Sequence, residues 1–454
     1  MTRKDEIKKG NAAFFLVAAA FVTAIWPYGH GQGINEITGT VICVSAFFSV
    51  LYLYLLNFCP EILKVNLKTV FLLIVIISFF LVTRIVLSYS SGKTLLLLVP
   101  YALAAVVVRT FYDGRIASVI LLVTLLLSGI LIPDPFEFVT MNFLTGLAAV
   151  YILSDLHRKG KAFLTALTVA LGNMLMFASF RLMKEGNLDT VALSDLLVFA
   201  GNGLLLLLTY PLIFVFEKRF RFLSDTTLLE LSDTNQPLLR KLADEAPGSF
   251  QHSLQVANLA EEAARVTGAN PLLARAGALY HDIGKIAGPA YYAENQGNGT
   301  SLHDSMDPVD SARIIINHVN SGIILARNFR LPVQIIDFIK THHGTSVAFY
   351  FYKKFTEKQH FNTGQEKDFT YPGPKPFSKE TAIVMMADAV EASSRSLGKQ
   401  NEENINETVE RIILLQEQSG QFSEVPFTFK DISDIKEAFK KRLVTMYHGR
   451  IAYQ

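Results

Sequence analysis

The chain has 454 residues, of which 50% are hydrophobic and 18% charged, a balance that favours a membrane protein of two or three domains. Its formal net charge of +2 gives no general argument for nucleic-acid binding. The only cysteines, Cys43 and Cys59, lie in or at the end of an apolar run, which argues against a disulfide framework and a thiolate metal site.

Long apolar runs fill residues 11–217, and we assign residues 1–217 to a transmembrane domain. Because a helical span needs about 20 mostly apolar residues, we expect eight spans. They lie at approximately 11–28, 37–58, 69–90, 95–111, 116–132, 136–155, 161–183 and 191–217. The fourth and fifth are short, and a re-entrant pair is the alternative there.

Lysine and arginine gather in every second inter-span segment, and this bias predicts that both chain termini are cytoplasmic. The first span begins like a signal peptide. No small-x-small cleavage pattern follows within Trp26–Gly29, so we expect an uncleaved anchor.

Four polar side chains interrupt the apolar segments. Arg84 lies within or near the end of the third span, where a charge is costly and marks a functional candidate, unless its side chain reaches the outer interface. Asn173, Asp195 and Asn202 lie in later spans, where hydrogen bonding between helices explains them at least as well as a ligand site.

Residues 218–248 are charged and helical in character, and we interpret them as a connector. Its helix is expected to begin within Asp233–Pro237 and to stop at Pro247-Gly248. The connector either carries movement of the membrane domain into the soluble half or acts as a passive tether.

Residues 249–454 have the composition of a soluble domain, without a convincing alternating pattern for strands, so we expect it to be all-helical. Capping residues, prolines and glycines recur in the order that helices require. Helix starts are predicted at Ser249 as an N-cap, at Asn270-Pro271, at Asp307-Pro308, at Leu331-Pro332 and at Ser378, and helix stops at Gly284 and Gly344.

A histidine and an aspartate, His281 and Asp282, stand side by side at the end of an apolar helix, and Lys285 follows three residues later. Imidazole nitrogen and carboxylate oxygen together suit divalent transition metals. Further candidate ligands lie inside or at the end of other apolar helical patterns, namely His252, His318, His342, His343 and Asp388.

Asp388 interrupts the otherwise apolar run Ala382–Val390, where a buried carboxylate needs a cation or good donors. A salt bridge to Arg395 would satisfy it, but the company of five histidines favours a metal. His342 and His343 are adjacent, and neighbours on a helix diverge by about 100°, so they serve two metals more easily than one.

The order Phe250-Gln251-His252-Ser253, then His281-Asp282-Ile283-Gly284-Lys285, then Thr341-His342-His343-Gly344-Thr345 resembles the HD-domain metal phosphohydrolases of the HDIG subgroup. It looks most like the seven-transmembrane HD phosphodiesterases of cyclic di-AMP (PgpH-type), closely over the C-terminal half and by layout alone over the membrane half. That resemblance implies a multi-pass protein of the bacterial inner membrane with a cytoplasmic HD domain at residues 249–454.

The resemblance also implies roles for the candidate residues. His252, His281, Asp282 and Asp388 would hold one metal ion, and His318, His342 and His343 a second, with Asp282 bridging two Mn or Fe ions. A shared hydroxide would attack phosphorus and yield linear pApA. Lys285 would neutralise the phosphate charge or assist the leaving oxygen, and an exposed surface lysine is the alternative.

Substrate contacts follow from the same resemblance. The Gly-Tyr-Pro signature of cyclic di-GMP enzymes is absent after His343, while the stretches Tyr291–Gln296 and Glu391–Leu397 are similar to the cyclic di-AMP group. They imply substrate binding by Tyr292, Asn295 and Arg395 beside Lys285, the arginine suiting a phosphate.

The family places a large extracellular domain after the first span, where about ten residues near Gly29–Thr38 stand here. The chain is therefore expected to lack that domain or to be a trimmed form. Expected partners are the lipid bilayer and a cyclic dinucleotide, without nucleic acid, and a homodimer is left open. The alternatives are another nucleotide substrate or a non-catalytic nucleotide receptor.

Overall fold

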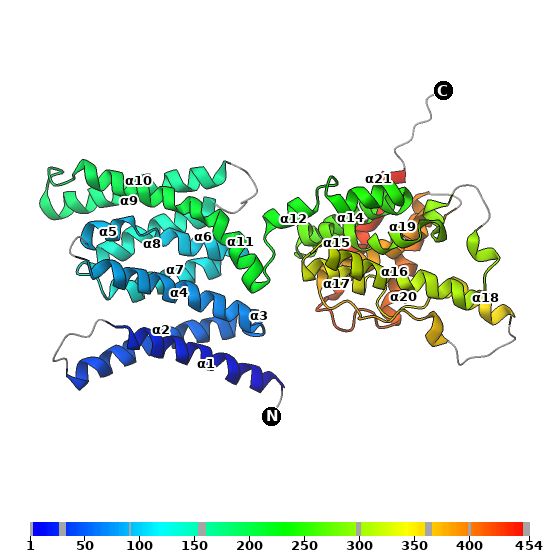
Figure 1. Cartoon of the computed structure of the whole chain (residues 1–454), viewed down its shortest axis with the longest axis horizontal. Coiled ribbons are helices and arrows are strands. Elements are labelled where there is room, and N and C mark those ends of the chain that lie inside the picture. Colours follow the sequence, from blue (N-terminus) through cyan, green and yellow to red (C-terminus); the bar gives the residue numbers. More distant parts are fainter. Residues whose placement is uncertain are drawn as a thin grey trace, which may run out of the picture. The chain divides into compact units, whose positions relative to one another are not determined.

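A computed structural model describes residues 3–26, 33–89, 92–152, 160–296, 301–358, 366–397 and 401–447. Its described residues form helices, with one isolated bridge between Val347 and Thr370 in place of any strand, which confirms the all-helical expectation (Figure 1). The chain divides into two compact units, Met1–Ser224 and Asp225–Gln454. Part of the predicted Trp26–Gly29 and Gly29–Thr38 segments, residues 27–32, lies outside the described residues.

The first unit is a bundle of apolar helices. They are α1 (Arg3–Ala24), α2 (Ile34–Phe58), α3 (Pro60–Leu63), α4 (Asn66–Leu87), α5 (Gly92–Leu98), α6 (Tyr101–Phe111), α7 (Gly114–Gly129), α8 (Pro135–Ile152), α9 (Lys161–Glu185), α10 (Leu193–Leu205), η2 (Leu206–Leu208) and α11 (Thr209–Phe220).

Five of these apolar stretches are long enough to cross a membrane, namely Ile34–Phe58, Asn66–Leu87, Pro135–Ile152, Lys161–Glu185 and Leu193–Phe220. Shorter apolar helices occupy Asn11–Ala24, Leu95–Phe111 and Gly114–Gly129. Each of the eight predicted spans therefore matches an apolar helical segment, and within the described residues five of these segments have the length of a span.

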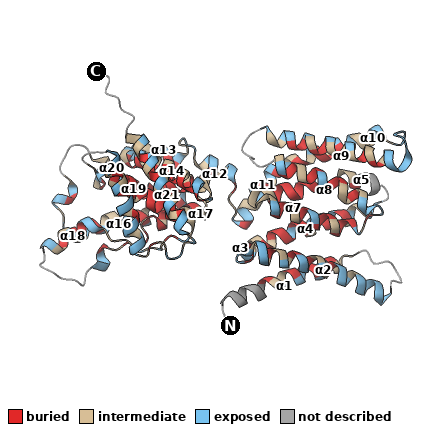
Figure 2. Ribbon diagram, turned by 180° about the vertical axis from the view of Figure 1, so that it is seen from behind, coloured by how far each residue is buried: buried red, intermediate tan, exposed pale blue. Residues whose placement is uncertain are grey.

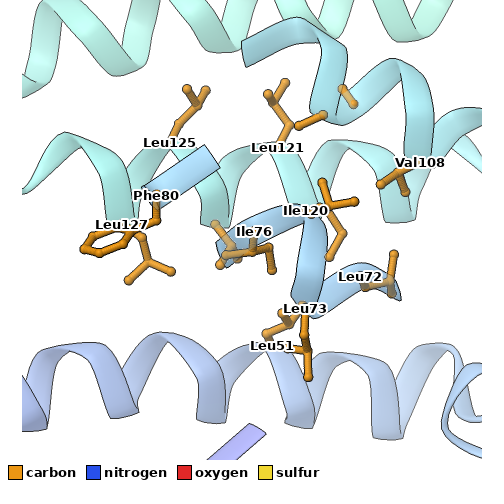
Figure 3. Close-up of a cluster of buried hydrophobic side chains, with 14 of the residues drawn as sticks. Leu51, Leu72, Leu73, Ile76, Phe80, Val108, Ile120, Leu121, Leu125 and Leu127 are labelled. Carbon is orange, nitrogen blue, oxygen red and sulfur yellow. The ribbon is translucent and has the colours of Figure 1, made fainter. Parts of the chain in front are cut away.

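Leucine, isoleucine and phenylalanine side chains fill the core between the helices of this unit. Leu72, Ile76 and Phe80 of α4 pack with Ile120 and Leu125 of α7 (Figure 3). Many residues on the outside of the bundle are exposed (Figure 2), and large apolar side chains such as Leu53, Val82 and Leu175 are among them. Apolar surface of this extent is unfavourable in water and fits a lipid environment.

A chain of hydrogen bonds crosses the bundle where the fourth apolar segment is interrupted. Pro100, between α5 and α6, has no N–H to donate, and the Asn202 amide donates to the carbonyls of Leu97 (3.0 Å) and Val99 (2.9 Å). Asn202 accepts from Asn173 (3.5 Å), which accepts from Thr145 (2.9 Å). Interhelical hydrogen bonding is thus confirmed for both asparagines.

The other two polar residues of the spans differ. Asp195 accepts from the backbone N–H of Ala192 at the start of α10 (3.2 Å), as a helix-capping residue does. The Nε atom of Arg84 is buried and has no hydrogen bond within the described part of the chain, so Arg84 remains a candidate.

Replacing Asn202 with leucine is expected to destabilise the membrane unit by about 1–2 kcal/mol, because two backbone carbonyls lose their donor inside an apolar bundle. Unfolding of the detergent-purified protein by SDS measures this. Asn57→Leu is the control, since Asn57 is exposed and bonds only one turn back to Leu53. Equal effects of the two substitutions would contradict the role of Asn202.

The second unit contains the remaining elements. They are α12 (Asp225–Leu231), α13 (Pro237–Glu245), α14 (Pro247–Val266), α15 (Pro271–Tyr280), η3 (Ile283–Ala287), η4 (Pro289–Tyr291), η5 (Ala293–Asn295), η6 (Leu302–Asp304), α16 (Pro308–Asn328), α17 (Val333–Thr341), α18 (Phe349–Lys358), η7 (Glu366–Phe369), α19 (Lys379–Arg395), α20 (Glu402–Gln418) and α21 (Phe429–Tyr447).

Most predicted helix starts are confirmed. The side chains of Asn270, Asp307 and Ser378 each accept a backbone N–H at the start of α15, α16 and α19. The prediction for Ser249 was wrong: α14 begins at Pro247 with Ala246 as its N-cap, because proline in the first turn starts a helix as readily as it stops the one before.

Gly284 was also wrongly predicted as a helix stop. α15 ends at Tyr280, and Gly284 lies inside η3 without a positive φ. Its lack of a side chain serves another purpose, because a Cβ atom there would overlap the backbone of His318 in α16. The predicted connector divides between the units, with α12 packing on α15 and α13 on α14 in the second.

Candidate metal centre

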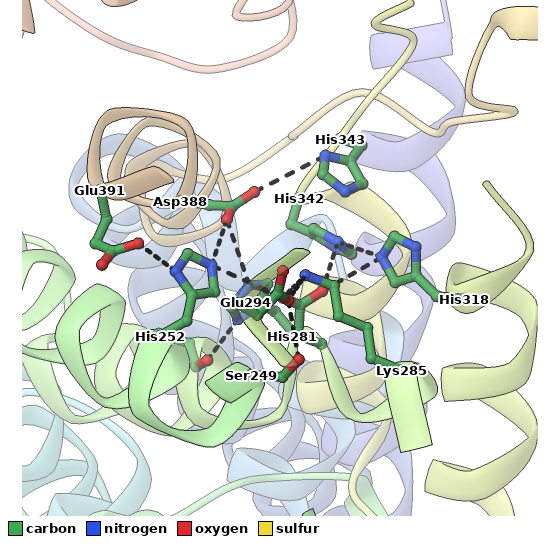
Figure 4. A network of polar contacts seen from close by, with 12 residues as sticks. Ser249, His252, His281, Lys285, Glu294, His318, His342, His343, Asp388 and Glu391 are labelled. Carbon is green, nitrogen blue, oxygen red and sulfur yellow. Dashed lines mark hydrogen bonds and ion pairs between the residues drawn. The ribbon is translucent and has the colours of Figure 1, made fainter. Parts of the chain in front are cut away.

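Seven nitrogen- and oxygen-bearing side chains converge at the centre of the second unit (Figure 4). His252 comes from the first turns of α14 and Asp388 from the middle of α19, while His281 and Asp282 follow α15 directly. His318 comes from α16, and His342 and His343 follow α17. All are buried except His343, whose side chain is 26% exposed.

The first group comprises His252, His281, Asp282 and Asp388. His252 Nε2 lies 2.8 Å from Asp388 Oδ1, and His281 Nε2 lies 3.2 Å from Asp282 Oδ2. One potential donor atom from each of the four residues lies within 4.8 Å of the others. The predicted first set of ligands is therefore brought together by the fold.

The second group comprises His318, His342 and His343, whose donor atoms also lie within 4.8 Å of one another. His318 Nε2 and His342 Nε2 approach to 3.0 Å. The geometric objection to adjacent histidines sharing one ion does not apply, because His342 caps α17 and His343 lies beyond its end, where helical spacing no longer holds.

Asp282 stands between the two groups. Its Oδ2 atom faces His281, whereas its Oδ1 atom lies 3.4 Å from His318 Nε2 and 3.7 Å from His342 Nε2. A carboxylate that offers one oxygen to each group has the arrangement of a ligand that bridges two ions.

The imidazole rings are held by their Nδ1 atoms. His281 Nδ1 donates to the carbonyl of Ala278 (2.6 Å), His318 Nδ1 to that of Ile315 (2.6 Å) and His342 Nδ1 to that of Ile339 (2.9 Å). Because a neutral imidazole carries one N–H, these bonds leave each Nε2 lone pair directed into the centre.

Among the described residues, three buried atoms of the centre have no hydrogen bond, namely His281 Nε2 and both oxygens of Asp282, although Lys285 Nζ contacts Asp282 Oδ2 as an ion pair. Unpaired polar atoms in a buried site are costly, and nitrogen and carboxylate donors suit Mn or Fe. The donor set therefore fits a pair of divalent cations.

The electrostatics of the centre favour metal ligation. Burial alone would raise the pKa of Asp282, but Lys285 and His281 lower it well below its usual value, so the carboxylate is charged. Burial lowers the pKa of His342 well below its usual value and that of His343 to about 3, which keeps both rings neutral. Burial would lower the pKa of His281 too, but Asp282 and Asp388 raise it to about 10, so a metal would compete there with a proton.

Lys285 is not the exposed surface lysine of the alternative interpretation. Its side chain is 14% exposed, and Nζ lies 2.7 Å from Asp282 Oδ2 and 2.7 Å from Glu294 Oε1. Burial would lower the pKa of Lys285, but the two carboxylates raise it, so the ammonium remains charged beside the centre. Tyr292 is buried with its ring 5.1 Å from Nζ.

The other two predicted substrate contacts lie farther out. The Asn295 amide bonds to the Ser249 backbone N–H (3.1 Å) and hydroxyl (2.9 Å), which fastens η5 to the start of α14. Arg395 is 40% exposed and lies 4.0 Å from Glu391, so the suggested salt bridge from Arg395 to Asp388 is replaced by contacts of Asp388 with histidines. The substrate roles of Tyr292, Asn295 and Arg395 stay predictions.

Three residues of the centre were given no role from the sequence, although Glu294 and Glu391 lie in the stretches that resemble the cyclic di-AMP group. Glu391 accepts from His252 Nδ1, Glu294 holds Lys285, and the buried ring of Tyr371 lies 4.1 Å from that of His343. Glu391 follows Asp388 by three residues on a helix, and this same-face spacing was a usable signal. Glu294 and Tyr371 come from short or irregular segments without a local pattern.

Adding Mn²⁺ at about 100 times its Kd is expected to stabilise the protein by about 2.7 kcal/mol for each site filled, and to raise Tm by about 5–10 °C. Scanning fluorimetry with and without EDTA measures this. Mg²⁺ is the control ion, because it prefers oxygen ligands. Equal shifts with both ions would argue against a histidine-lined site.

Comparison with known proteins covers both units. A family model described as a 7TM receptor with intracellular HD hydrolase matches residues 34–224, and an HD domain model matches residues 249–393. The cyclic-di-AMP phosphodiesterase PgpH of Bacillus subtilis is 36% identical over 92% of this chain and 60% of its own length. That of Listeria monocytogenes is 34% identical over 92% and 59%.

A solved structure, the L. monocytogenes PgpH HD domain in complex with cyclic-di-AMP, is 41% identical, covers 48% of this chain and 100% of its own, and gives a TM-score of 0.45. The chain thus spans about 60% of the length of the curated relatives it matches. The two family models follow each other in the order of the two units, so the chain is a multi-pass membrane protein that joins a unit similar to the 7TM receptors with an intracellular HD hydrolase to a unit similar to the HD domains.

Proposed function

We propose that this chain is a metal-dependent phosphodiesterase that hydrolyses cyclic di-AMP to linear pApA. The observation that carries the proposal is the buried Asp282 carboxylate, which presents one oxygen to each of two groups of potential metal ligands. The names of the relatives from B. subtilis and L. monocytogenes supply the substrate.

Two divalent ions, Mn or Fe, would supply a hydroxide nucleophile at neutral pH and neutralise charge on the phosphate. His252, His281, Asp282 and Asp388 would hold one ion, and His318, His342 and His343 the other, with Asp282 shared. The hydrogen bonds from Nδ1 to backbone carbonyls fix three of the rings, so that little reorganisation is needed on binding.

Lys285 would act on the phosphate directly. Its ammonium group lies beside the bridging carboxylate, held by Glu294 at 2.7 Å and covered by the ring of Tyr292. A fixed positive charge in a buried site stabilises the charge that develops on phosphate oxygens or on the leaving 3′-oxygen. Tyr292, Asn295 and Arg395 would then orient the nucleotide, with Arg395 the most accessible of the three.

We place the protein in the bacterial inner membrane with both termini in the cytoplasm, since the lysine and arginine bias of the loops supports this orientation. The HD domain would then meet its substrate in the cytoplasm. A homodimer and the absence of a nucleic-acid partner stay predictions.

The test is incubation of the detergent-purified protein with cyclic di-AMP and Mn²⁺, or Fe²⁺ under reducing conditions, with products separated by chromatography. We expect pApA, no product in EDTA, and slower or no cleavage of cyclic di-GMP. Bound metal and bound cyclic di-AMP without turnover would favour the receptor hypothesis instead. Hydrolysis of a different nucleotide, without hydrolysis of cyclic di-AMP, would show that the enzyme has another substrate.

Replacing Lys285 with methionine is expected to lower kcat about 100-fold, because a preorganised charge next to the phosphate is lost, while Mn content stays unchanged. Steady-state kinetics and metal analysis measure the two effects. Lys379→Met is the control, since Lys379 pairs with Asp431 at 3.0 Å away from the centre. A raised KM with unchanged kcat would show that Lys285 only binds substrate.

A further inference from the structure

His252 is anchored differently from His281, His318 and His342. Its Nδ1 atom bonds to the carboxylate of Glu391, whereas theirs donate to backbone carbonyls. Glu391 is 2% exposed and comes from α19, the helix that also carries Asp388. A buried carboxylate is expensive to maintain, so this anchor differs in energy as well as in chemistry.

Two carboxylates of α19, from Asp388 and Glu391, therefore contact the two nitrogens of the His252 ring. Asp388 Oδ1 lies 2.8 Å from His252 Nε2, and Glu391 Oε2 contacts Nδ1 (Figure 4). The three-residue spacing of 388 and 391 places both side chains on one face of the helix, toward α14. The carboxylate oxygen of Glu391 is the acceptor of this hydrogen bond, so the Nδ1 atom of His252 carries the proton.

We propose that Glu391 is a positioning residue that fixes the tautomer and orientation of His252, so that its Nε2 lone pair is available to the first metal ion beside Asp388. This inference rests on the metal centre of the proposed function. A carboxylate behind a histidine ligand also makes the imidazole a stronger donor, and loss of such a partner costs about 10–100-fold in metal affinity.

The effect is confined to one of the two ligand groups. Glu391 contacts His252 alone among the seven residues of the centre in the described structure, and its other charged neighbour is Arg395 at 4.0 Å. Within the described residues Glu391 has no contact with His318, His342 or His343, and His318 and His342 keep their own backbone anchors. Loss of Glu391 would weaken the site of His252, His281, Asp282 and Asp388 and leave the other site intact.

The test titrates Mn²⁺ into the metal-free full chain in detergent and follows both binding steps by calorimetry and by the electron paramagnetic resonance signal of free Mn²⁺. We expect Glu391→Leu to weaken one step about 10–100-fold with the other unchanged. Glu391→Gln keeps an acceptor for Nδ1 but loses the charge, so its loss should be smaller. Glu380→Gln is the control. Glu380 lies on α19 like Glu391, but its carboxylate accepts from the backbone N–H of Asn270 at 2.9 Å and not from a histidine of the centre.

The outcomes separate the inference from the proposed function. If the parent protein binds no Mn²⁺, the proposed metal centre is rejected, and with it the proposed function. A parent that binds two ions, with both steps unchanged in Glu391→Leu and Glu391→Gln, overturns the role of Glu391 alone. If Glu391→Leu fails to fold, the Gln variant decides: one weakened step with an unchanged Tm supports positioning, and two unchanged steps reject it.

The membrane unit carries a second and independent candidate, a cavity of about 320 Å³ between helix ends. It is lined by Leu87 of α4, Leu97 of α5, Asn142 of α8, Phe177 and Arg181 of α9 and Asp195 of α10, with Asp134 and Glu137 beside them. It adjoins the interruption at Pro100, since Leu97 lines the cavity and gives its carbonyl to Asn202. Interrupted spans next to a cavity are typical of binding sites in membrane proteins.

Three groups that line the cavity have hydrogen-bonding or charge-pairing capacity left over, namely Asn142, Asp195 and Arg181. Asn142 is 5% exposed and donates to the Phe138 carbonyl at 2.9 Å, but its Oδ1 atom accepts no hydrogen bond within the described residues. Lys184 pairs with Asp134 (3.2 Å) and Glu137 (2.7 Å), and Arg181 with Glu185 (2.8 Å), whereas Asp195 has no cationic partner in the described part of the unit. Arg181 Nε is buried and has no hydrogen bond within the described residues. The cavity thus offers a hydrogen-bond acceptor, a carboxylate without a cationic partner and apolar walls, with one unused guanidinium donor beside them.

We infer that this cavity binds an organic ammonium ion with an apolar body. The ammonium group would pair with Asp195 and donate to Asn142, and the body would lie against Leu97 and Phe177. A soluble amine and the amine headgroup of a phospholipid share this chemistry.

The test uses the full chain in nanodiscs of phosphatidylcholine and phosphatidylglycerol, with dansylcadaverine as the amine probe and neutral dansylamide as its control. We expect saturable binding of the amine alone, weakened at least about tenfold by Asp195→Asn, as the loss of a charge pair in an apolar site predicts. Asp189→Asn, at an exposed position in the loop before α10, should leave binding of the amine probe unchanged. Displacement by phosphatidylethanolamine would assign the site to a lipid, and displacement by n-butylamine alone to a soluble amine. Equal binding of the neutral probe, or full binding by Asp195→Asn, overturns the inference.

Discussion

Replacing Asp282 with alanine is expected to lower turnover of cyclic di-AMP by about 10³-fold or more and to reduce Mn²⁺ binding at both sites together. The reason is that the Asp282 carboxylate lies 3.2 Å from His281 in one ligand group and 3.4 Å and 3.7 Å from His318 and His342 in the other. Asp388 approaches one member of the second group, His343, at 3.8 Å. Two metal ions contribute several kcal/mol of transition-state stabilisation, and each 1.36 kcal/mol is a factor of ten in rate. Product chromatography and metal analysis measure the two losses.

The control for this prediction is Asp431→Asn. Asp431 is also largely buried, but it caps α21 through Thr428 (2.8 Å) and pairs with Lys379, far from any histidine of the centre. It should lose stability and keep its metals. An Asp282→Ala protein that retained both ions, or lost only one, would show that the carboxylate does not bridge.

The residues that the fold brings together as candidate ligands could be predicted because each member carries a local signal. His281-Asp282 is an adjacent pair, and Asp388 is a charge inside an apolar run, which chemistry rarely tolerates without a partner. Each histidine lies in or at the end of a helix, and side-chain caps confirm the predicted starts of two of these helices, α15 and α16. A side-chain cap also confirms the predicted start of α19, which carries Asp388. The division into two groups came from family resemblance, since helical spacing alone argued against His342 and His343 sharing a group.

What supports the ligands was harder to predict. Glu294 reaches Lys285 from a 3-10 turn that Asn295 fastens to Ser249, and Tyr371 reaches His343 from an irregular segment. Neither segment has the regular spacing of apolar residues from which the direction of its side chains could be predicted. Ser249 shows that a local pattern can also mislead. Its hydroxyl was predicted to cap a helix, but it donates to Glu294, which lies 45 residues away in the chain.

Replacing Gly284 with alanine is expected to disable the centre without touching a ligand. A Cβ atom at Gly284 would overlap the carbonyl of His318 and crowd the N–H of Gly322, both of which belong to the backbone of α16. Backbone atoms of a helix cannot rotate away as a side chain can, so α16 must move, at a cost of about 3 kcal/mol or more. His318 moves with it, and the second ligand group opens.

Gly268→Ala is the matched control. Gly268 has a φ of +67° and no atom within 4 Å of an added Cβ, so alanine there meets only the backbone penalty of about 1–2 kcal/mol. Chemical denaturation and Mn²⁺ titration of both variants separate the two effects. Gly284→Ala should lose the site of His318, His342 and His343 even below its unfolding transition, while Gly268→Ala should be less stable than the parent and bind both ions. Full metal binding by Gly284→Ala would mean that η3 yields instead of α16, and that the spacing between Asp282 and His318 does not depend on this glycine.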